Sequence, residues 1–265
     1  MIVDVFMFLD DFDMLDCRLY ELDGIVDRFI VIEGDMTFSG IPKPYLLTEA
    51  MAAGRYSAYP ITVVRAELGD TSMIPFQAKD WMTPESKPNW RREEKQRDAA
   101  NHLLADLSGD DLVIYGDMDE IPRREIVAGF DGQPMCLWMY YLVYSLRYRH
   151  PVAWAGPVIG KHGSIGSSPK SARDDRQGKY QRIPDAGWHL GWFGEPEDRM
   201  QKLAAHTHQE LAEETKGGLA VDYPAQMIHV NSGVKLLDYD YDWGLPRWVS
   251  DGYAPEIWNK KWDPR

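Results

Sequence analysis

Three carboxylates follow a short apolar run in the middle of the chain. Asp117, Asp119 and Glu120 come after Leu112–Tyr115, whose β-branched and aromatic residues predict a strand buried on both faces. Side chains two apart on an extended chain point the same way, so Asp117 and Asp119 should project together. Such close carboxylates favour a cation, and Mg²⁺ or Mn²⁺ bound to oxygen ligands commonly shares its shell with phosphates. The pattern predicts a metal–diphosphate site, with an acidic surface turn as the alternative.

The elements around this turn alternate between strands and helices, as in an α/β domain. Ile2–Leu9 and Arg28–Glu33 predict strands, and between them a helix over Met14–Leu22 is capped by Asp13. Such a short crossover implies parallel pairing with a right-handed connection. Further strands are predicted at Tyr59–Arg65, Met135–Arg147 and Trp154–Lys161. One further helix is predicted to begin at Asn89, and two more to span Arg123–Phe130 and Glu197–Glu214. Two stretches are expected as surface segments, Gly69–Pro88 and Gly163–Gln181.

The first turns of the helix from Asn89 are rich in positive charge, which the helix dipole disfavours at an N-terminus. The cations are Arg91, Arg92, Lys95 and Arg97. This cluster indicates an anion nearby, with a solvated basic face as the alternative.

Composition limits the classes of protein to consider. The chain has 265 residues, enough for one large α/β domain, and a formal charge of −13, which disfavours a broad nucleic-acid-binding face. Its two cysteines, Cys17 and Cys136, form no C-x-x-C pair, which favours free thiols. The first residues lack the features of a signal peptide, and no apolar stretch is long enough to span a membrane. We therefore expect a cytoplasmic protein.

Seven motifs along the chain resemble glycosyltransferase family 17, in the order found in that family. They are F-x-F-x-x-D-F-D-M-L-D-x-R-L-x-E-L from Phe6, V-D-R-F-I-V-I-E, T-F-S-G-x-P-K-P, W-R-R-E-x-x-Q-R-D, D-L-V-I-Y-G-D-M-D-E-I-P, M-Y-Y-L-V-Y and D-A-G-W-H-L-G-W. The resemblance spans roughly residues 2–215. Since no membrane anchor or luminal stem is present, a bacterial, phage or viral relative is expected.

The resemblance implies a single GT-A-type, Rossmann-like α/β domain with a mostly parallel mixed sheet flanked by helices. Residues 1–130 would form the nucleotide-binding half, 131–215 the acceptor and catalytic half, and 216–265 an aromatic-rich C-terminal extension. It further implies an inverting transfer of a sugar, GlcNAc by expectation, from a UDP-sugar to a hydroxyl of a glycan or other acceptor. Mn²⁺ or Mg²⁺ would neutralise the charge that develops on the leaving diphosphate.

By this resemblance, Asp119 is the expected direct metal ligand. Asp117 would reach the ribose or, through water, the metal, and Glu120 would support them. GT-A enzymes commonly take a later histidine as a further ligand, for which His208 is the candidate and His206 its neighbour; a solvated His208 is the alternative.

The remaining roles follow from position in the chain. The expected general base is Asp185, with Glu195 and Asp198 as further candidates and a turn or cap residue as the alternative for Asp185. The expected contacts to the donor are Trp188 and His189 at the sugar, Arg92 and Arg97 at the diphosphate, Asp98 at the uracil or ribose, and Phe6 and Glu33 beside the uracil. Core packing is the alternative for Trp188, and a solvated strand end for Glu33.

Three other functions are compatible with parts of the sequence. One is a non-catalytic module that binds a nucleotide sugar or glycan through the aromatic tail, which would not need both Asp117 and Asp119. Another is a metal-dependent phosphohydrolase, which would need more histidine and aspartate at short spacing. The third is a phage-type enzyme that glycosylates modified DNA bases, which the net charge makes less attractive.

Overall fold

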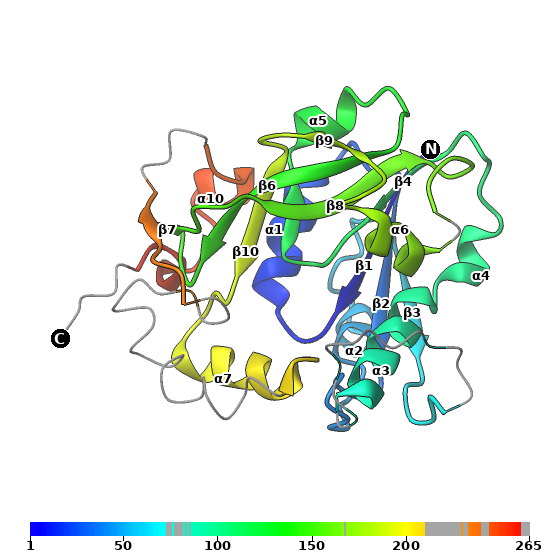
Figure 1. Cartoon of the computed structure of the whole chain (residues 1–265), viewed down its shortest axis with the longest axis horizontal. Helices are drawn as coiled ribbons and strands as arrows, with labels where there is room; N and C mark the ends of the chain where they lie inside the picture. Colours follow the sequence, from blue (N-terminus) through cyan, green and yellow to red (C-terminus); the bar gives the residue numbers. More distant parts are fainter. Residues whose placement is uncertain are drawn as a thin grey trace.

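The computed structural model describes residues 1–72, 86–166, 168–209, 233–239 and 244–260, and the single residues 76, 82, 84 and 229. In this part of the chain, eleven strands form one mixed sheet with helices packed around it (Figure 1). One half is parallel, in the order β3-β2-β1-β4. These strands are β1 (Ile2–Phe8), β2 (Arg28–Gly34), β3 (Ile61–Ala66) and β4 (Leu112–Tyr115). The predicted parallel core is confirmed, with strand ends within two residues of expectation.

The other half of the sheet is mixed. Its long strands are β6 (Met135–Val143), β8 (Trp154–Lys161) and β10 (Gly187–Gly191). β8 pairs antiparallel with both β4 and β6, while β10 runs parallel to β6 and antiparallel to β5 (Glu120–Pro122). The short strands β7 (Tyr148–Arg149), β9 (Gln181–Ile183) and β11 (Leu237–Asp238) complete it. The α/β fold with a mixed sheet flanked by helices is therefore confirmed.

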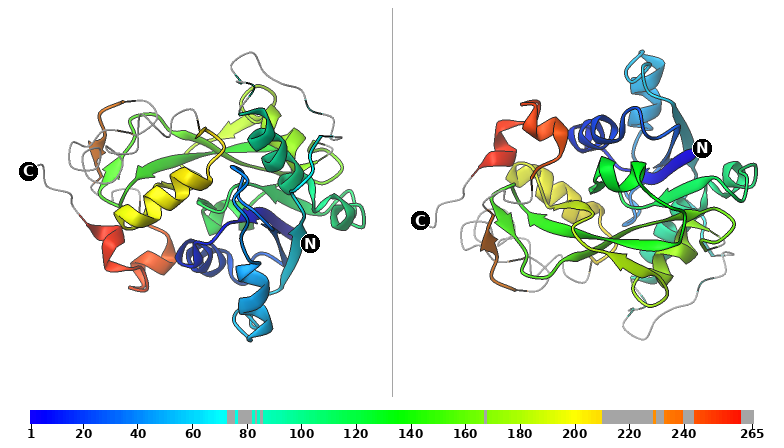
Figure 2. Two further views of the ribbon diagram at one scale, coloured as in Figure 1. Left: turned by 90° about the horizontal axis from the view of Figure 1, so that it is seen from below. Right: turned by 90° about the horizontal axis from the view of Figure 1, so that it is seen from above.

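The helices cover both faces of the sheet (Figures 1 and 2). They are α1 (Phe12–Leu22), α2 (Leu46–Ala52), α3 (Lys87–Asp98), α4 (Asn101–Leu104), α5 (Arg124–Ala128), α6 (Pro169–Asp175), α7 (Pro196–Ala205), α10 (Arg247–Ser250) and the 3-10 helix η3 (Glu256–Asn259). None of the helices among the described residues is both long and apolar enough to cross a bilayer.

Strand β2 shows why the parallel half is buried on both sides. Its apolar residues alternate between two clusters, with Ile30 and Ile32 in one and Phe29 and Val31 in the other. All four side chains are at most 1% exposed. A continuous apolar run is what a strand covered on both faces requires.

Several predicted boundaries were wrong. Helix α1 begins earlier than expected because Asp11, not Asp13, accepts the backbone N–H of Met14 as its cap. Strand β6 stops at Val143 rather than Arg147, because Tyr144 has a left-handed φ of 68°. Helix α7 ends at Ala205, and the remainder of the predicted Glu197–Glu214 helix lies largely outside the described residues.

The segment Gly163–Gln181 was wrongly predicted to be a surface segment. Much of it forms α6, whose Ser168 side chain caps the helix by accepting the backbone N–H of Ser171. Arg173 of this helix is 5% exposed and points toward the acidic turn. Helix α6 is thus part of the support of the site.

Candidate active site

The acidic turn between β4 and β5 is fixed by a buried arginine. Arg18 of α1 is fully buried and donates to both carboxylate oxygens of Asp4, at 2.7 and 2.8 Å. The same guanidinium donates to the backbone carbonyls of Asp117, at 2.9 Å, and Glu120, at 2.6 Å. A planar guanidinium with its donors in a rigid fork holds several acceptors in one geometry. The turn is therefore fastened to both β1 and α1.

The Glu120 carboxylate is the second fixed point of the turn. It is fully buried and accepts hydrogen bonds from the backbone N–H of Asp117 at 2.9 Å and from the indole of Trp154 at 2.6 Å. Arg173 donates to both of its oxygens. A buried carboxylate with this many donors is a structural group, as the sequence predicted for Glu120.

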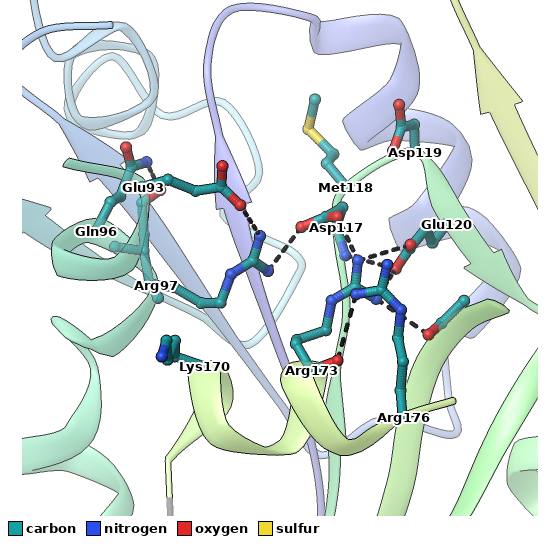
Figure 3. Close-up of polar contacts among 12 residues, drawn as sticks. Glu93, Gln96, Arg97, Asp117, Met118, Asp119, Glu120, Lys170, Arg173 and Arg176 are labelled. Carbon is teal, nitrogen blue, oxygen red and sulfur yellow. Dashed lines mark hydrogen bonds and ion pairs between the residues drawn. The ribbon is translucent and has the colours of Figure 1, made fainter. Parts of the chain in front are cut away.

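Asp117 is held between two arginines, as Figure 3 shows. Arg97 of α3 donates to Oδ1 at 2.7 Å, and Arg173 donates to Oδ2. Burial by itself would raise the pKa of Asp117, but Arg173 and then Arg97 outweigh it and hold that pKa well below its usual range. Since both oxygens already accept charged hydrogen bonds, Asp117 acts here mainly as an anchor.

Asp119 points away from the arginine cluster, as Figure 3 also shows. Its Oδ2 accepts a hydrogen bond from the ammonium of Lys202 at 2.9 Å, and Nε2 of His189 lies 3.6 Å from Oδ1. Burial would raise the pKa of Asp119, but Lys202 and then His189 lower it well below its usual range. Asp119 is therefore ionised and is held by groups that do not touch Asp117.

Both aspartates line a cavity of about 570 Å³ at the carboxyl ends of β1, β2 and β4. Open α/β sheets bind their ligands at this edge, and this volume is in the range of small-molecule sites. Acids outnumber permanent cations on the described wall. The acids are Asp10, Asp11, Asp13, Glu93, Asp117, Asp119 and Asp198; the cations are Arg97 and Lys202. A diphosphate would be repelled by this wall unless a further cation accompanied it.

His206, at the end of α7, contributes a neutral imidazole to the same cavity. Burial, followed by the neighbouring His208, lowers the pKa of His206 to about 4. Its Nδ1 accepts the backbone N–H of His208 at 3.0 Å. In a neutral imidazole with an accepting Nδ1, the proton is on Nε2. His206 is therefore a hydrogen-bond donor at Nε2 and offers no free lone pair to a metal in this geometry.

Five residues predicted for the site line the cavity: Arg97, Asp117, Asp119, His189 and Asp198. His189 is 7% exposed, and its ring packs between those of Tyr141 and Trp154, with centroids 4.5 and 4.3 Å away. Asp198 also accepts the backbone N–H of Glu195 at 2.8 Å, within the first turn of α7. The structure thus brings together residues from three separate motifs and from helix α7.

Phe6 and Glu33 do not line the cavity, because their strands extend beyond them. Phe6 is 1% exposed and packs against the Arg18 guanidinium. The Glu33 carboxylate accepts the backbone N–H groups of Leu47 and Thr48 at the start of α2. The cavity wall at the ends of β1 and β2 is formed instead by Phe8, Thr37 and Phe38, among others.

Arg92 and Asp98 serve the packing of α3 rather than the cavity. Arg92 donates to the backbone carbonyl of Phe38 at 2.9 Å and to the Asn89 side chain. Asp98 accepts from the Ser168 hydroxyl and from the backbone N–H of Lys170, at the start of α6. Both roles differ from the predicted contacts to diphosphate, uracil or ribose.

Trp188 and Asp185 also lie outside the cavity wall. Successive residues of β10 face opposite sides, so Trp188 points away from His189 and its ring packs against the Arg123 guanidinium, 4.2 Å away. Asp185 precedes β10 and accepts the Tyr140 hydroxyl at 2.6 Å. Asp119 lies at the other end of β10 from Asp185, where the backbone carbonyl of Asp119 accepts the N–H of Leu190. The predicted role of Asp185 as base is therefore corrected.

Two further predicted residues lie off the cavity wall. Glu195 is the N-cap residue of α7, and its backbone is tied to Asp198. His208 follows α7 instead of lying on a helix, and its ring packs edge-on against Trp90 with centroids 4.8 Å apart. No group of three or more His, Cys, Asp or Glu side chains among the described residues is arranged to hold a metal ion. His208 thus lies outside the cavity wall that contains Asp119.

Several residues of the site were not predicted from the sequence, and His206 was named only as the neighbour of His208. Lys202 precedes His206, the C-cap residue of α7, by four residues, and this spacing is a signal present in the sequence. Tyr141 and Trp154 line the cavity from strands that were predicted, but the faces they present were not. Arg173 lies in the segment expected on the surface, so no local signal pointed to it.

Comparison with known proteins shows the family of the chain. A model of glycosyltransferase family 17 matches residues 1–220 of the chain, a span that includes every residue of the acidic turn and of α7. The chain belongs to glycosyltransferase family 17. The family's enzymes are glycosyltransferases, so the chain is an enzyme of that class.

Three curated relatives carry the same name, β-1,4-mannosyl-glycoprotein 4-β-N-acetylglucosaminyltransferase. The human, rat and mouse proteins are each 29% identical to the chain over 147 residues. The match covers 53% of this chain and 26% of each relative. It therefore spans about a quarter of the length of these relatives.

Two solved structures illustrate the similarity of the chain to other proteins. The galactosyltransferase LgtC, in complex with donor and acceptor sugar analogues, is 15% identical over 62% of this chain and 58% of its own, with a TM-score of 0.32. Glucosyl-3-phosphoglycerate synthase from Mycobacterium tuberculosis, in complex with Mn²⁺, UDP and phosphoglyceric acid, is 14% identical over 94% and 91%, with a TM-score of 0.33.

The carboxylate chemistry of the site fits one divalent cation held mainly by Asp119. Mg²⁺ and Mn²⁺ use one or two carboxylates together with substrate phosphates and water. Asp119 is ionised and lines the cavity, while the present partner of its Oδ2, Lys202, is a flexible side chain that is 37% exposed. An ion at Asp119 would require that ammonium to move.

Proposed function

We propose that the chain catalyses the inverting, metal-dependent transfer of GlcNAc from UDP-GlcNAc to a hydroxyl group of a glycan or similar acceptor. The observation that carries this proposal is the ionised Asp119 carboxylate in a nucleotide-sized cavity at the carboxyl ends of β1 and β4. The names of the curated relatives support GlcNAc and a glycan acceptor. The UDP and Mn²⁺ bound by the mycobacterial synthase are properties of that protein.

The surplus of acids on the cavity wall supports the requirement for a metal. A bound Mn²⁺ or Mg²⁺ would be held by Asp119 and would neutralise charge on the leaving diphosphate. Arg97 lines the same wall, but its N–H groups are directed to Asp117 and Glu93, at 2.7 and 2.9 Å. The two cations of the described wall, Arg97 and Lys202, are thus both paired with carboxylates of the chain.

The parts of the donor can be assigned by position. Phe8, at the end of β1, and Phe38, in the loop after β2, would flank the uracil in place of Phe6 and Glu33. His189 would contact the sugar, with Trp154 and Trp192 offering aromatic faces beside it. These assignments keep the nucleotide in the 1–130 half and the sugar near residues of the 131–215 half.

We favour Asp198 among the three candidates for the general base because of its position in the cavity wall. It lines the cavity, whereas Asp185 and Glu195 do not. Inversion requires a carboxylate that accepts the proton of the attacking hydroxyl while the diphosphate departs from the opposite side. The hydrogen bond from the backbone N–H of Glu195 fixes the orientation of Asp198.

The test is donor turnover: release of UDP from a panel of UDP-sugars, with and without Mn²⁺, by the wild-type protein and by Asp119→Ala. We expect slow metal-dependent hydrolysis of UDP-GlcNAc that is lost in the variant. If no UDP-sugar is turned over, the proposal fails. Binding without turnover would then favour a non-catalytic module, and turnover only with modified DNA would favour a base-modifying enzyme.

A further inference from the structure

The ammonium of Lys202 occupies a position that a divalent cation would otherwise take. It lies 2.9 Å from Oδ2 of Asp119 and 5.8 Å from the ring centre of Trp192, in the wall of the cavity. Its strongest further attractions come from Asp11 and Asp10. The lysine is thus the cation that a surplus of carboxylates holds in this part of the cavity.

The two aspartates of the acidic turn differ in how firmly their cations are held. Arg97 and Arg173, on Asp117, have side chains that are 9% and 5% exposed. Lys202, on Asp119, is 37% exposed and has a long side chain with a single charged end. One carboxylate is therefore locked by buried guanidinium groups, while the other has a partner that can exchange.

The backbone next to this pair is strained. Trp192 directly follows β10 and has a φ of 61°, which a bulky side chain rarely adopts. This conformation leaves its ring near both the Lys202 ammonium and the imidazole of His206, whose centroid is 5.9 Å away. Strain of this kind persists where the surroundings impose it and is concentrated at functional sites.

Helix α7 presents two donors to the same space. Lys202 and His206 are separated by one turn, and both line the cavity. The ammonium and the Nε2–H of His206 are suited to phosphate oxygens, which accept hydrogen bonds from both kinds of group.

We propose that Lys202 is an exchangeable cation: it neutralises Asp119 before the donor binds, is displaced by the divalent ion, and then contacts the diphosphate together with His206. This inference rests on the proposed function, because it requires a metal and a diphosphate in the cavity. It predicts opposite effects of one substitution on two binding steps. A lysine with a merely structural role would weaken both steps when removed.

The test uses Lys202→Met and two equilibrium measurements that involve no turnover. Mn²⁺ binding in the absence of nucleotide is followed by electron paramagnetic resonance, and UDP binding at saturating Mn²⁺ by calorimetry. We expect Lys202→Met to bind Mn²⁺ about fivefold more tightly, since a partly exposed ion pair no longer competes. We expect the same variant to bind UDP about tenfold more weakly, since a charged hydrogen bond to the diphosphate is lost.

Lys179→Met is the matched control, because Lys179 forms an ammonium–carboxylate pair with Asp175 at 3.0 Å and does not line the cavity. It should change neither measurement. Asp119→Asn should abolish Mn²⁺ binding. Unchanged or weaker Mn²⁺ binding by Lys202→Met, or no Mn²⁺ binding by any form, would overturn the inference, as would undiminished UDP affinity. Failure of the proposed function would instead appear as absent turnover of every UDP-sugar.

Discussion

Replacing Arg173 with methionine should be among the most damaging single changes in the described part of the protein. The substitution removes the group that bonds both oxygens of the fully buried Glu120 and one oxygen of Asp117. Breaking a buried ion pair by removing one partner typically costs about 3–5 kcal/mol.

We therefore expect Arg173→Met to lose about 3–5 kcal/mol of unfolding free energy at pH 7. Urea denaturation followed by tryptophan fluorescence measures this loss.

Arg176→Met is the matched control for this experiment. It makes the same chemical change three residues along, on a guanidinium whose pKa is lowered by burial and then by Arg173. Among the described residues, Arg176 donates to the backbone carbonyl of Arg173 and to no carboxylate. Arg176→Met should lower the unfolding free energy by less than about 1 kcal/mol. Equal losses in the two variants, or a loss below about 1 kcal/mol in Arg173→Met, would refute the account of the acidic turn.

Three further outcomes follow from the structure. The folded state holds His206 neutral with a pKa of about 4, whereas a histidine in the unfolded chain binds a proton below about pH 6.5. The wild-type protein should therefore lose stability between pH 6.5 and pH 4 relative to His206→Gln, and urea midpoints measured across this range test this. Asp198→Asn can keep the bond from the Glu195 N–H but cannot accept a proton, so kcat should fall about a hundredfold or more while Mn²⁺ and UDP affinities, measured by calorimetry, stay unchanged. Gly187→Ala would place a Cβ 2.2 Å from the Ile121 carbonyl oxygen, which should cost more than about 2 kcal/mol in thermal unfolding; a loss below 0.5 kcal/mol would contradict this packing.

The parallel half of the fold was predictable because its signals are local. Apolar runs such as the one in β2 form strands wherever both faces of the sheet are covered. The acidic turn directly follows another such run, strand β4. The turn itself was found for this reason, and Asp119 is where the sequence placed it. Phe6 was assigned to the uracil although its strand continues for two more residues, so Phe8 and not Phe6 reaches the cavity.

The rest of the site depends on contacts between distant parts of the chain. Arg173 meets Glu120 across 53 residues, and Lys202 meets Asp119 across 83. A run of Ser, Lys and Arg around α6 is compatible with a surface segment until tertiary packing buries one arginine. Asp185 failed as a base for a similar reason: its place before β10 could not reveal which end of that strand meets Asp119.

The most direct test of the central claim is a crystal structure of the protein with Mn²⁺ and UDP, with anomalous scattering used to locate the metal. The account predicts one anomalous peak within about 2.2 Å of an Asp119 carboxylate oxygen, in contact with the diphosphate. Lys202 should have left Asp119 for the phosphates. A nucleotide bound elsewhere, or a metal with no contact to Asp119, would contradict the account.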